Sequence, residues 1–359
     1  MSFNFGTNVR ISVFGQSHSE AIGVVLDGLP PGEEIDLAGV QSFMLRRAPG
    51  QNTFSTSRRE PDRAKVISGL LAGKTCGSPL CAIIENTDCK SADYANIFDV
   101  PRPSHADYCA YMKYEGANDI RGGGHFSGRL TAPLCFAGAV CLQILERRGI
   151  FIGAHIQSIG EIADKSFDPV LVEAAELTAV ANKPFAVLDD AIGQQMLEQI
   201  ELVKGQADSI GGVIECCAVG VPVGLGEPIF CGLENKLATA VFAIPAVKGV
   251  EFGTGFASSK LRGSQNNDEF YYDNNGLVKT RTNHHGGILG GIASGMPIIM
   301  RIAFKPTPSI GLQQSSIRLS QKTNTTISIK GRHDPCIVPR AVPCVEAAMA
   351  ITLLDLLNR

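Results

Sequence analysis

The stretch PLCFAGAVCLQILERR, residues 133–148, is apolar on nearly every side when it is drawn as a helix. Pro133 stands where a helix can begin, and Gly149 follows where a helix can end. A surface helix shows one apolar stripe, whereas a helix that is apolar all round is buried. The stretch therefore predicts a helix buried inside the fold, and other segments must cover it.

Several segments outside this helix have the pattern of strands. They are residues 9–14, 21–28, 152–159, 212–222, 296–304 and 325–330. Further helices are expected after a cap at Asp36, after a cap at Asp189 or Asp190, and over residues 345–357. Residues 150–185 and 265–280 are expected to be surface connections.

The order of these elements favours one α+β domain over residues 1–359, with antiparallel sheet packed on buried helices. The alternation of strands and helices is too irregular for a TIM barrel. No proline- or serine-rich linker divides the chain, and motif-bearing loops run from residue 15 to residue 340. One site that draws on the whole chain is the expected arrangement.

The composition narrows the classes of function. The net charge is −3, and no stripe of basic and aromatic residues is present, so neither nucleic acid nor membrane is an expected partner. The N-terminal residues contain no apolar signal region, and no apolar run is long enough to span a membrane. The eleven cysteines are expected to be reduced, mostly buried side chains of a cytoplasmic protein.

Positive charge is concentrated locally. Residues 46–65 carry six basic side chains against Glu60 and Asp62. Glycine clusters at 122–124 and 284–291 allow backbone N–H groups to approach an anion, and FKPTPS (304–309) adds a lysine and hydroxyls. Each feature is weak by itself, but together they indicate that the protein binds a phosphorylated small molecule.

Four histidines lie in polar loops, namely His18, His105, His125 and His333. Each can be structural, or can exchange protons near neutral pH. Asp334 has two interpretations as well: a turn aspartate before a proline, or a carboxylate kept ionised by a basic neighbour and able to act as a base. No H-x-x-x-H or C-x-x-C pair occurs, so a metal site is not expected.

These residues stand in motifs that resemble those of the chorismate synthase family along the whole chain. The motifs include GQSHSEAIGVVLDGLPPG, RRAPGQNTFSTSRREPD, PRPSHADY, KYEGANDIRGGGHFSGR, AVKGVEFGTGF, NHHGGILGGIASG, KPTPSI and GRHDPCIVPRAVPCVEA. So many ordered motifs in one chain are far more specific than any single glycine loop.

The resemblance implies a homotetramer of subunits in which a helical layer lies between antiparallel sheets. It implies anti-1,4-elimination of phosphate from 5-enolpyruvylshikimate 3-phosphate, giving chorismate for aromatic amino acid biosynthesis. The family requires reduced FMN although the reaction is redox-neutral. No long insert that could carry a flavin reductase is present, so a monofunctional bacterial type served by a separate reductase is expected. Thr53 stands where some members have an arginine, which weakens the case for an NADPH contact there.

The resemblance also assigns roles to individual residues. The catalytic residues implied are His18, beside the departing phosphate, His105, beside the reduced flavin, and Asp334, which helps in proton removal. The substrate-binding residues implied are Ser17, Arg47, Arg58 and Arg129. The FMN-binding residues implied are His125, Phe126, Ser127, Pro245, Ala246, Gly290, Lys305, Pro306, Thr307, Pro308, Ser309 and Arg332.

The segment after the three glycines departs from the commonest family form, R-S-S-A-R-E-T. It reads HFSGRLT, residues 125–131, a form that a subgroup of bacterial members shares.

The sequence leaves two other interpretations of the function open. One is a flavin- or nucleotide-binding relative without catalysis, which the presence of His18, His105 and Asp334 disfavours. The other is a phosphate-ester hydrolase, for which a metal or an activated nucleophile would be expected.

Overall fold

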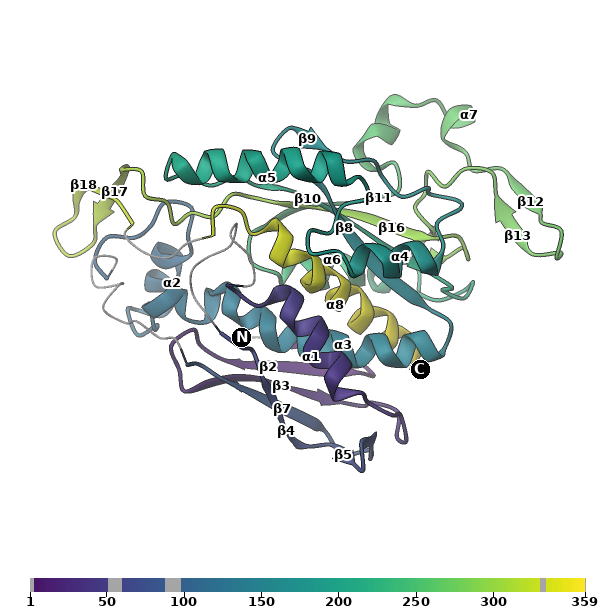
Figure 1. Ribbon diagram of the computed structural model, residues 1–359, viewed down its shortest axis with the longest axis horizontal. Coiled ribbons are helices and arrows are strands. Elements are labelled where there is room, and N and C mark those ends of the chain that lie inside the picture. The colour runs from purple at the N-terminus through teal and green to yellow at the C-terminus, as the bar shows by residue number, and fades with distance from the viewer. Residues whose placement is uncertain (1–2, 51–59, 88–97, 330–333, 359) are drawn as a thin grey trace.

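The computed structural model describes residues 3–50, 60–87, 98–329 and 334–358, and shows a layer of helices between two antiparallel sheets (Figure 1). The predicted α+β sandwich is confirmed, and no barrel forms from the described strands. The first sheet has the order β1-β2-β3-β7-β4, from Asn4–Phe5, Arg10–Gly15, Ala21–Asp27, Leu80–Glu85 and Ala64–Ser68. The second has the order β11-β16-β10-β8-β9, from Val247–Phe252, Ile298–Phe304, Gly212–Val219, Phe151–Ile159 and Ile162–Ala163.

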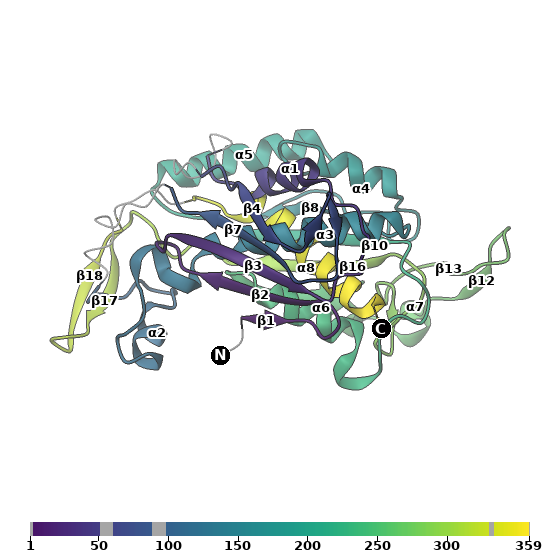
Figure 2. The ribbon, with the colours of Figure 1, turned by 90° about the horizontal axis from the view of Figure 1, so that it is seen from below.

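Helices α3 and α8 form the centre of the sandwich. Helix α3 spans Thr131–Arg147 and α8 spans Val338–Leu357, and nearly all of their side chains are buried. The two helices approach closely at Gly138, where a Cβ atom would lie 2.1 Å from the Cβ atom of Ala347. Figure 2 shows the first sheet in front of these two helices. The stretch at 133–148 is therefore buried, as its pattern predicts.

Helix α3 also has the length and composition of a membrane-spanning helix. In the window Gly128–Arg147, however, 78% of the residues are buried inside the molecule. It is the core helix of this fold.

Four other helices complete the packing. Helix α1 (Leu37–Arg47) packs on α3 and α8, and α6 (Leu233–Phe242) packs on α8. Asp36 caps α1 by accepting a hydrogen bond from the backbone of Ala38 at 2.9 Å, as expected. Helices α4 (Ala174–Ala181) and α5 (Asp190–Gly205, capped by Asp189) cover the outer face of the second sheet. The second sheet is thus buried on both faces.

A buried carboxylate on α8 ties the two ends of the described chain together. Asp355 accepts hydrogen bonds from the backbone N–H groups of Thr7, Asn8 and Val9 at 2.8, 2.6 and 3.0 Å. These residues lead into strand β2 of the first sheet. A residue near the end of α8 therefore holds the backbone just before strand β2 in place.

The remaining elements are short and lie around the sandwich. They are α2 (Asp107–Lys113), α7 (Gly263–Asn266), β5 (Leu70–Leu71), β6 (Lys74–Thr75), β12 (Phe270–Tyr272), β13 (Val278–Thr280), β14 (Ile288–Leu289), β15 (Ile292–Ala293), β17 (Gln314–Arg318) and β18 (Thr323–Ile327). The hairpins β12–β13 and β17–β18 project from opposite ends of the molecule (Figures 1 and 2).

Some predicted boundaries are wrong. Helix α8 begins at Val338 rather than at 345. Pro339 lies in its first turn, where the missing N–H donor costs no helical hydrogen bond, whereas Pro343 lies inside the helix. Residues 150–185 are not a surface connection, since they hold the buried strand β8 and helix α4. Residues 265–280 contain α7 and the strands of a hairpin.

Candidate active site

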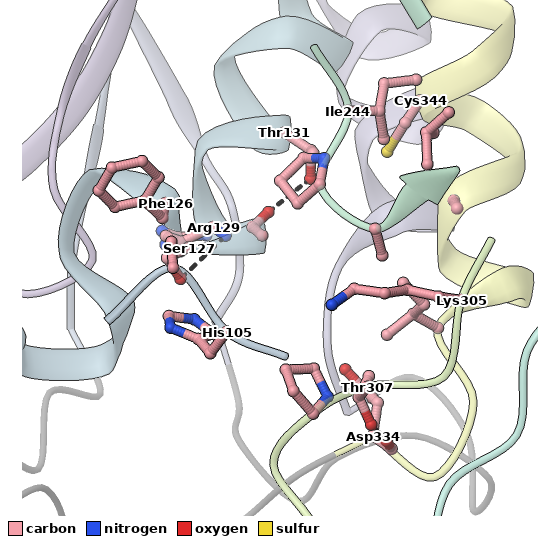
Figure 3. Close-up of a pocket in the computed structure, with 18 of the residues that line it drawn as sticks. His105, Phe126, Ser127, Arg129, Thr131, Ile244, Lys305, Thr307, Asp334 and Cys344 are labelled. Carbon is pink, nitrogen blue, oxygen red and sulfur yellow. Dashed lines mark hydrogen bonds between the residues drawn. The ribbon is translucent and has the colours of Figure 1, made fainter. Parts of the chain in front are cut away.

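A cavity of about 680 Å³ lies where the loops at one end of the helical layer meet. This volume is typical of a small-molecule site. Figure 3 shows His105, Phe126, Ser127 and Arg129 on one side of it, and Lys305, Thr307 and Asp334 on the other. The first group comes from segments before α3, and the second from segments between β16 and α8. Residues from both halves of the chain therefore line the cavity.

The cavity wall is strongly cationic. Asp334 is the acidic side chain that lines it within the described residues. The cationic side chains that line it are Arg47, Arg102, Arg129, Lys248, Lys305 and Arg340. This excess attracts anions although the whole chain carries a negative net charge.

The triple glycine at 122–124 separates two of the predicted histidines. Its residues have φ values of +60°, +85° and +55°, which glycine adopts readily. A Cβ atom on Gly122 would lie 2.5 Å from His18 Nδ1, and one on Gly123 would lie 3.3 Å from His105 Nε2. The segment is therefore a thin spacer between two imidazoles, whereas its composition alone suggests a phosphate cradle.

His105 is held by a buried ion pair. Asp107, at the start of α2, accepts hydrogen bonds from Arg102 Nε and Nη2 at 2.7 and 2.8 Å. His105 Nδ1 lies 2.5 Å from Asp107 Oδ1 and 3.0 Å from Arg102 Nη2. Burial by itself raises the pKa of Asp107, but hydrogen bonds from Arg102 and His105 outweigh burial and hold that pKa well below its usual range. The Nδ1–H thus donates to the carboxylate, and Nε2 is left toward Gly123.

Two arginines share one buried carboxylate behind the cavity wall. Asp62 forms ion pairs with both Arg47 and Arg129, and none of its side chain is exposed. Arg129 also donates to the side chain of Asn86 at 2.8 Å, and Arg47 donates to the hydroxyl of Thr131 at 3.0 Å. Burial opposes ionisation of Asp62, yet the two guanidinium groups hold its pKa below its usual value. Both arginines are consequently fixed in position before any ligand binds.

A third arginine, Arg340, extends this arrangement. It lies in the first turns of α8, forms an ion pair with Asp334 and donates to the backbone carbonyl of Arg47 at 3.0 Å. Burial lowers the pKa of Arg340, with Asp334 opposing the shift. The predicted carboxylate therefore lies at the cavity wall with a guanidinium beside it.

His125 has a different environment from the other histidines. Its ring contacts Phe3 and Tyr114 edge-on, with centroids 5.8 and 5.2 Å apart, and lies 4.3 Å from the ring of Phe126. Its Nε2 is buried and has no hydrogen-bond partner among the described residues. Burial lowers the pKa of His125, and Asp119 opposes this. Burial thus favours the neutral form of the imidazole, and its Nε2 is available to a ligand.

The opposite wall is built by the loop after β16. Lys305 donates to the backbone carbonyl of Ser104, and Thr307 donates to the backbone carbonyl of Asp334 at 2.9 Å. Ser309 accepts a hydrogen bond from Arg102 Nη1 at 3.1 Å. Burial, followed by the charge of Lys248, lowers the pKa of Lys305. The loop is thus joined to the segments that carry His105.

Most of the predicted site residues line this cavity. They are Arg47, His105, His125, Phe126, Ser127, Arg129, Pro245, Ala246, Lys305, Thr307, Pro308, Ser309 and Asp334. Ser17 and His18 do not line it but lie against Gly122, which does. Pro306 and Gly290 are absent from the lining, and Gly290 lies in the turn between β14 and β15. Arg58, Arg332 and His333 lie outside the described residues.

Sequence reasoning missed Arg102, Arg340 and the end of α6 as parts of the wall. Arg102 stands three residues before His105 in PRPSHAD, so its proximity could have been noticed. Arg340 was hidden because residues 338–344 were not assigned to a helix, whose first turn directs it toward Asp334.

Comparisons with known proteins agree with this arrangement. Residues 9–357 match the family model described as chorismate synthase. A chorismate synthase from Dehalococcoides mccartyi is 45% identical over 359 residues, which cover 100% of this chain and 97% of that protein. One from Pyrococcus abyssi is 47% identical over 350 residues, covering 98% and 96%. A crystal structure of chorismate synthase superposes with a TM-score of 0.76 at 28% identity, covering 98% of this chain and 92% of that one.

Proposed function

Because the chain belongs to the chorismate synthase family, we propose that the cavity is its active site and binds reduced FMN together with the substrate. The enzyme eliminates phosphate from 5-enolpyruvylshikimate 3-phosphate in the anti-1,4 sense and forms chorismate. It is a carbon–oxygen lyase of the shikimate pathway. We propose a role for each residue from the geometry of the cavity.

The residues present fit FMN. The wall offers apolar surface from Phe126, Ile244 and Ala246 for a flat ring system, and cationic groups for a phosphate. His125 Nε2, buried without a hydrogen-bond partner among the described residues, is a ready contact for a polar edge of the ring. Lys305 and Ser309 would hold the phosphate end. When bound, reduced FMN supplies electron density that offsets the electron deficiency of the substrate ring as its allylic C–O bond breaks.

The arginine cluster is proposed to bind the substrate. Arginine recognises carboxylate and phosphate groups in a bidentate manner, and the substrate carries both. Arg47 and Arg129 are fixed by Asp62, and Arg340 is fixed by Asp334. Since these partners are already in place, little reorganisation is needed on binding.

The two histidines are proposed to act on either side of the glycine spacer. His18, beside Gly122, supplies a proton to the departing phosphate. His105 has its Nδ1 engaged by Asp107, so its Nε2 can interact with a developing negative charge in the cavity. Asp334, paired with Arg340, assists the loss of the ring proton.

The observation that carries this assignment is that His105, Arg129, Arg47 and Asp334 meet in one cationic cavity although they are distant in sequence. An anaerobic assay with purified enzyme tests it. Chorismate should form with substrate and dithionite-reduced FMN, and none should form with oxidised FMN alone. A non-catalytic flavin-binding relative would bind FMN in both states and form no product.

We also propose the assembly and setting that the family resemblance implies. A homotetramer is supported by large apolar side chains on the surface, among them Val223, Ile229 and Phe230, which are 73%, 74% and 87% exposed. The proposed unit is a single functional domain, because the cavity draws on residues from 47 to 344. The proposed setting is the cytoplasm. Reduced FMN would come from a separate NAD(P)H-dependent reductase.

A further inference from the structure

Two cysteines from the central helices meet at the cavity wall. Cys135 of α3 and Cys344 of α8 have their sulfur atoms 3.7 Å apart, and their side chains are almost completely buried. Cys344 lines the cavity (Figure 3), whereas Cys135 is not among the lining residues. The ten described cysteines are all free, so this is a dithiol pair.

The surroundings make the two sulfur atoms unequal. The hydrogen bond from Cys135 lowers the pKa of Cys344, and the nearby charges of Arg47 and Arg340 add to this effect against burial. Burial raises the pKa of Cys135. Because the thiolate is the nucleophilic form, Cys344 is the reactive partner and Cys135 is the proton donor. Cys336 is also buried, but its surroundings differ, and burial raises the pKa of its thiol to about 12.

We propose that Cys135 and Cys344 form a redox-responsive pair that a small two-electron oxidant, such as hydrogen peroxide, converts into a disulfide from the cavity side. In the first step the Cys344 thiolate attacks one peroxide oxygen, giving a sulfenic acid and releasing hydroxide. In the second step Cys135 attacks the sulfenic sulfur, the S–S bond forms, and water leaves with the thiol proton. A thiol reductant returns both cysteines to the dithiol.

The disulfide changes the substrate-binding wall. An S–S bond is about 2 Å long, so the sulfur atoms must approach each other across the α3–α8 contact. The sulfur of Cys344 also lies 3.5 Å from the backbone carbonyl of Arg340, one turn earlier in α8. Oxidation removes the thiol proton that Cys344 donates to this carbonyl and shifts the turn that carries Arg340. Turnover of the oxidised enzyme is therefore lower.

Peptide mapping tests the cross-link directly. The enzyme is treated with hydrogen peroxide, its free thiols are alkylated under denaturing conditions, and the digest is analysed by mass spectrometry. We expect one linked pair of peptides containing Cys135 and Cys344, which dithiothreitol separates. Chorismate formation should fall by about tenfold or more and recover with dithiothreitol, as expected for a small displacement of a binding group. Because positions 209 residues apart are joined, the Tm of the oxidised enzyme should rise.

Matched variants distinguish the disulfide between Cys135 and Cys344 from oxidation of other thiols. Cys135→Ala should form no cross-link, and its Cys344 should be trapped by dimedone as the sulfenic acid. Cys135→Ser provides the same test if the alanine variant folds poorly. Cys141→Ala removes another buried thiol of α3 and should behave like the parent enzyme. The proposal is overturned if peroxide modifies the exposed Cys76 and Cys109 without forming the Cys135–Cys344 peptide, or if oxidised Cys135→Ala shows the same dithiothreitol-reversible rise in Tm as the parent.

Discussion

Replacing Asp62 with asparagine removes a buried carboxylate that pairs with two guanidinium groups at once. Removing one partner of a buried ion pair leaves an uncompensated charge and costs about 3–5 kcal/mol. Two arginines are affected here, but each keeps another contact: Arg129 has Asn86 at 2.8 Å and Glu60 at 3.9 Å, and Arg47 has Thr131 at 3.0 Å. We therefore expect the free energy of unfolding to fall by about 3–5 kcal/mol, and not by twice that amount.

Urea unfolding at a fixed protein concentration measures this loss, because the stability of the proposed tetramer would depend on concentration. The difference between the parent and Asp62→Asn should also depend on pH. The folded-state pKa of Asp62 is lowered, so its contribution is fully present above the unfolded value of about 3.9 and is lost as the pH falls through the lower folded value. The two proteins should consequently differ at pH 6–8 and converge in acid.

An anion should partly restore the variant. With Asp62 gone, Arg47 and Arg129 face each other across a neutral amide, and inorganic phosphate can take the place of the lost charge. Phosphate should therefore raise the Tm of Asp62→Asn more than that of the parent. The matched control is Asp27→Asn, which breaks the exposed Arg10–Asp27 pair and should cost about 0–1 kcal/mol. A loss in Asp62→Asn no larger than in this control would refute the reasoning.

Three further variants address the chemistry. His105→Ala should lower kcat by about 10²–10⁴ with reduced FMN while its circular dichroism stays unchanged, and near-normal turnover would remove the assigned role. Gly122→Ala places a Cβ atom 2.5 Å from His18 Nδ1 and should lower kcat by about tenfold or more. The control is Gly32→Ala, because Gly32 also has a positive φ (+85°) but has no atom within 4 Å of the added Cβ. This control should lose about 1–2 kcal/mol of stability and keep the kcat of the parent. Asp334→Asn should retain substrate binding and lose roughly tenfold or more in kcat, and an unchanged kcat would exclude it from proton removal.

Local sequence signals predicted the elements whose determinants lie within one segment. Helix α1 was predictable because Asp36 caps it and Val40 and Met44 recur on one face. The burial of α3 followed from its apolar pattern on all sides. The start of α8 was not predictable in this way, because Pro343 is normally a sign against a helix and here lies within its first turns.

The site was predictable only in part for a similar reason. Motif resemblance named most of the side chains that line the cavity, but no local pattern shows that Asp62 pairs with both Arg47 and Arg129. The glycines at 122–124 suggested an anion cradle, and their role as a spacer depends on loops around residues 18 and 105 that pack on either side. Such contacts between distant segments exist only after the chain has folded.

The central position of α8 has a consequence for biosynthesis. Every described strand of both large sheets is synthesised before this helix, which then packs between them and holds Thr7, Asn8 and Val9 through Asp355. Until residues 338–357 leave the ribosome, the inner face of the second sheet at β8 and β10 and the side of α3 that faces α8 lack their main packing partner. A nascent chain of this length with exposed apolar surface is prone to aggregation. The translating ribosome must therefore deliver nearly the whole chain before the sandwich can close, and chaperone binding should persist until that point.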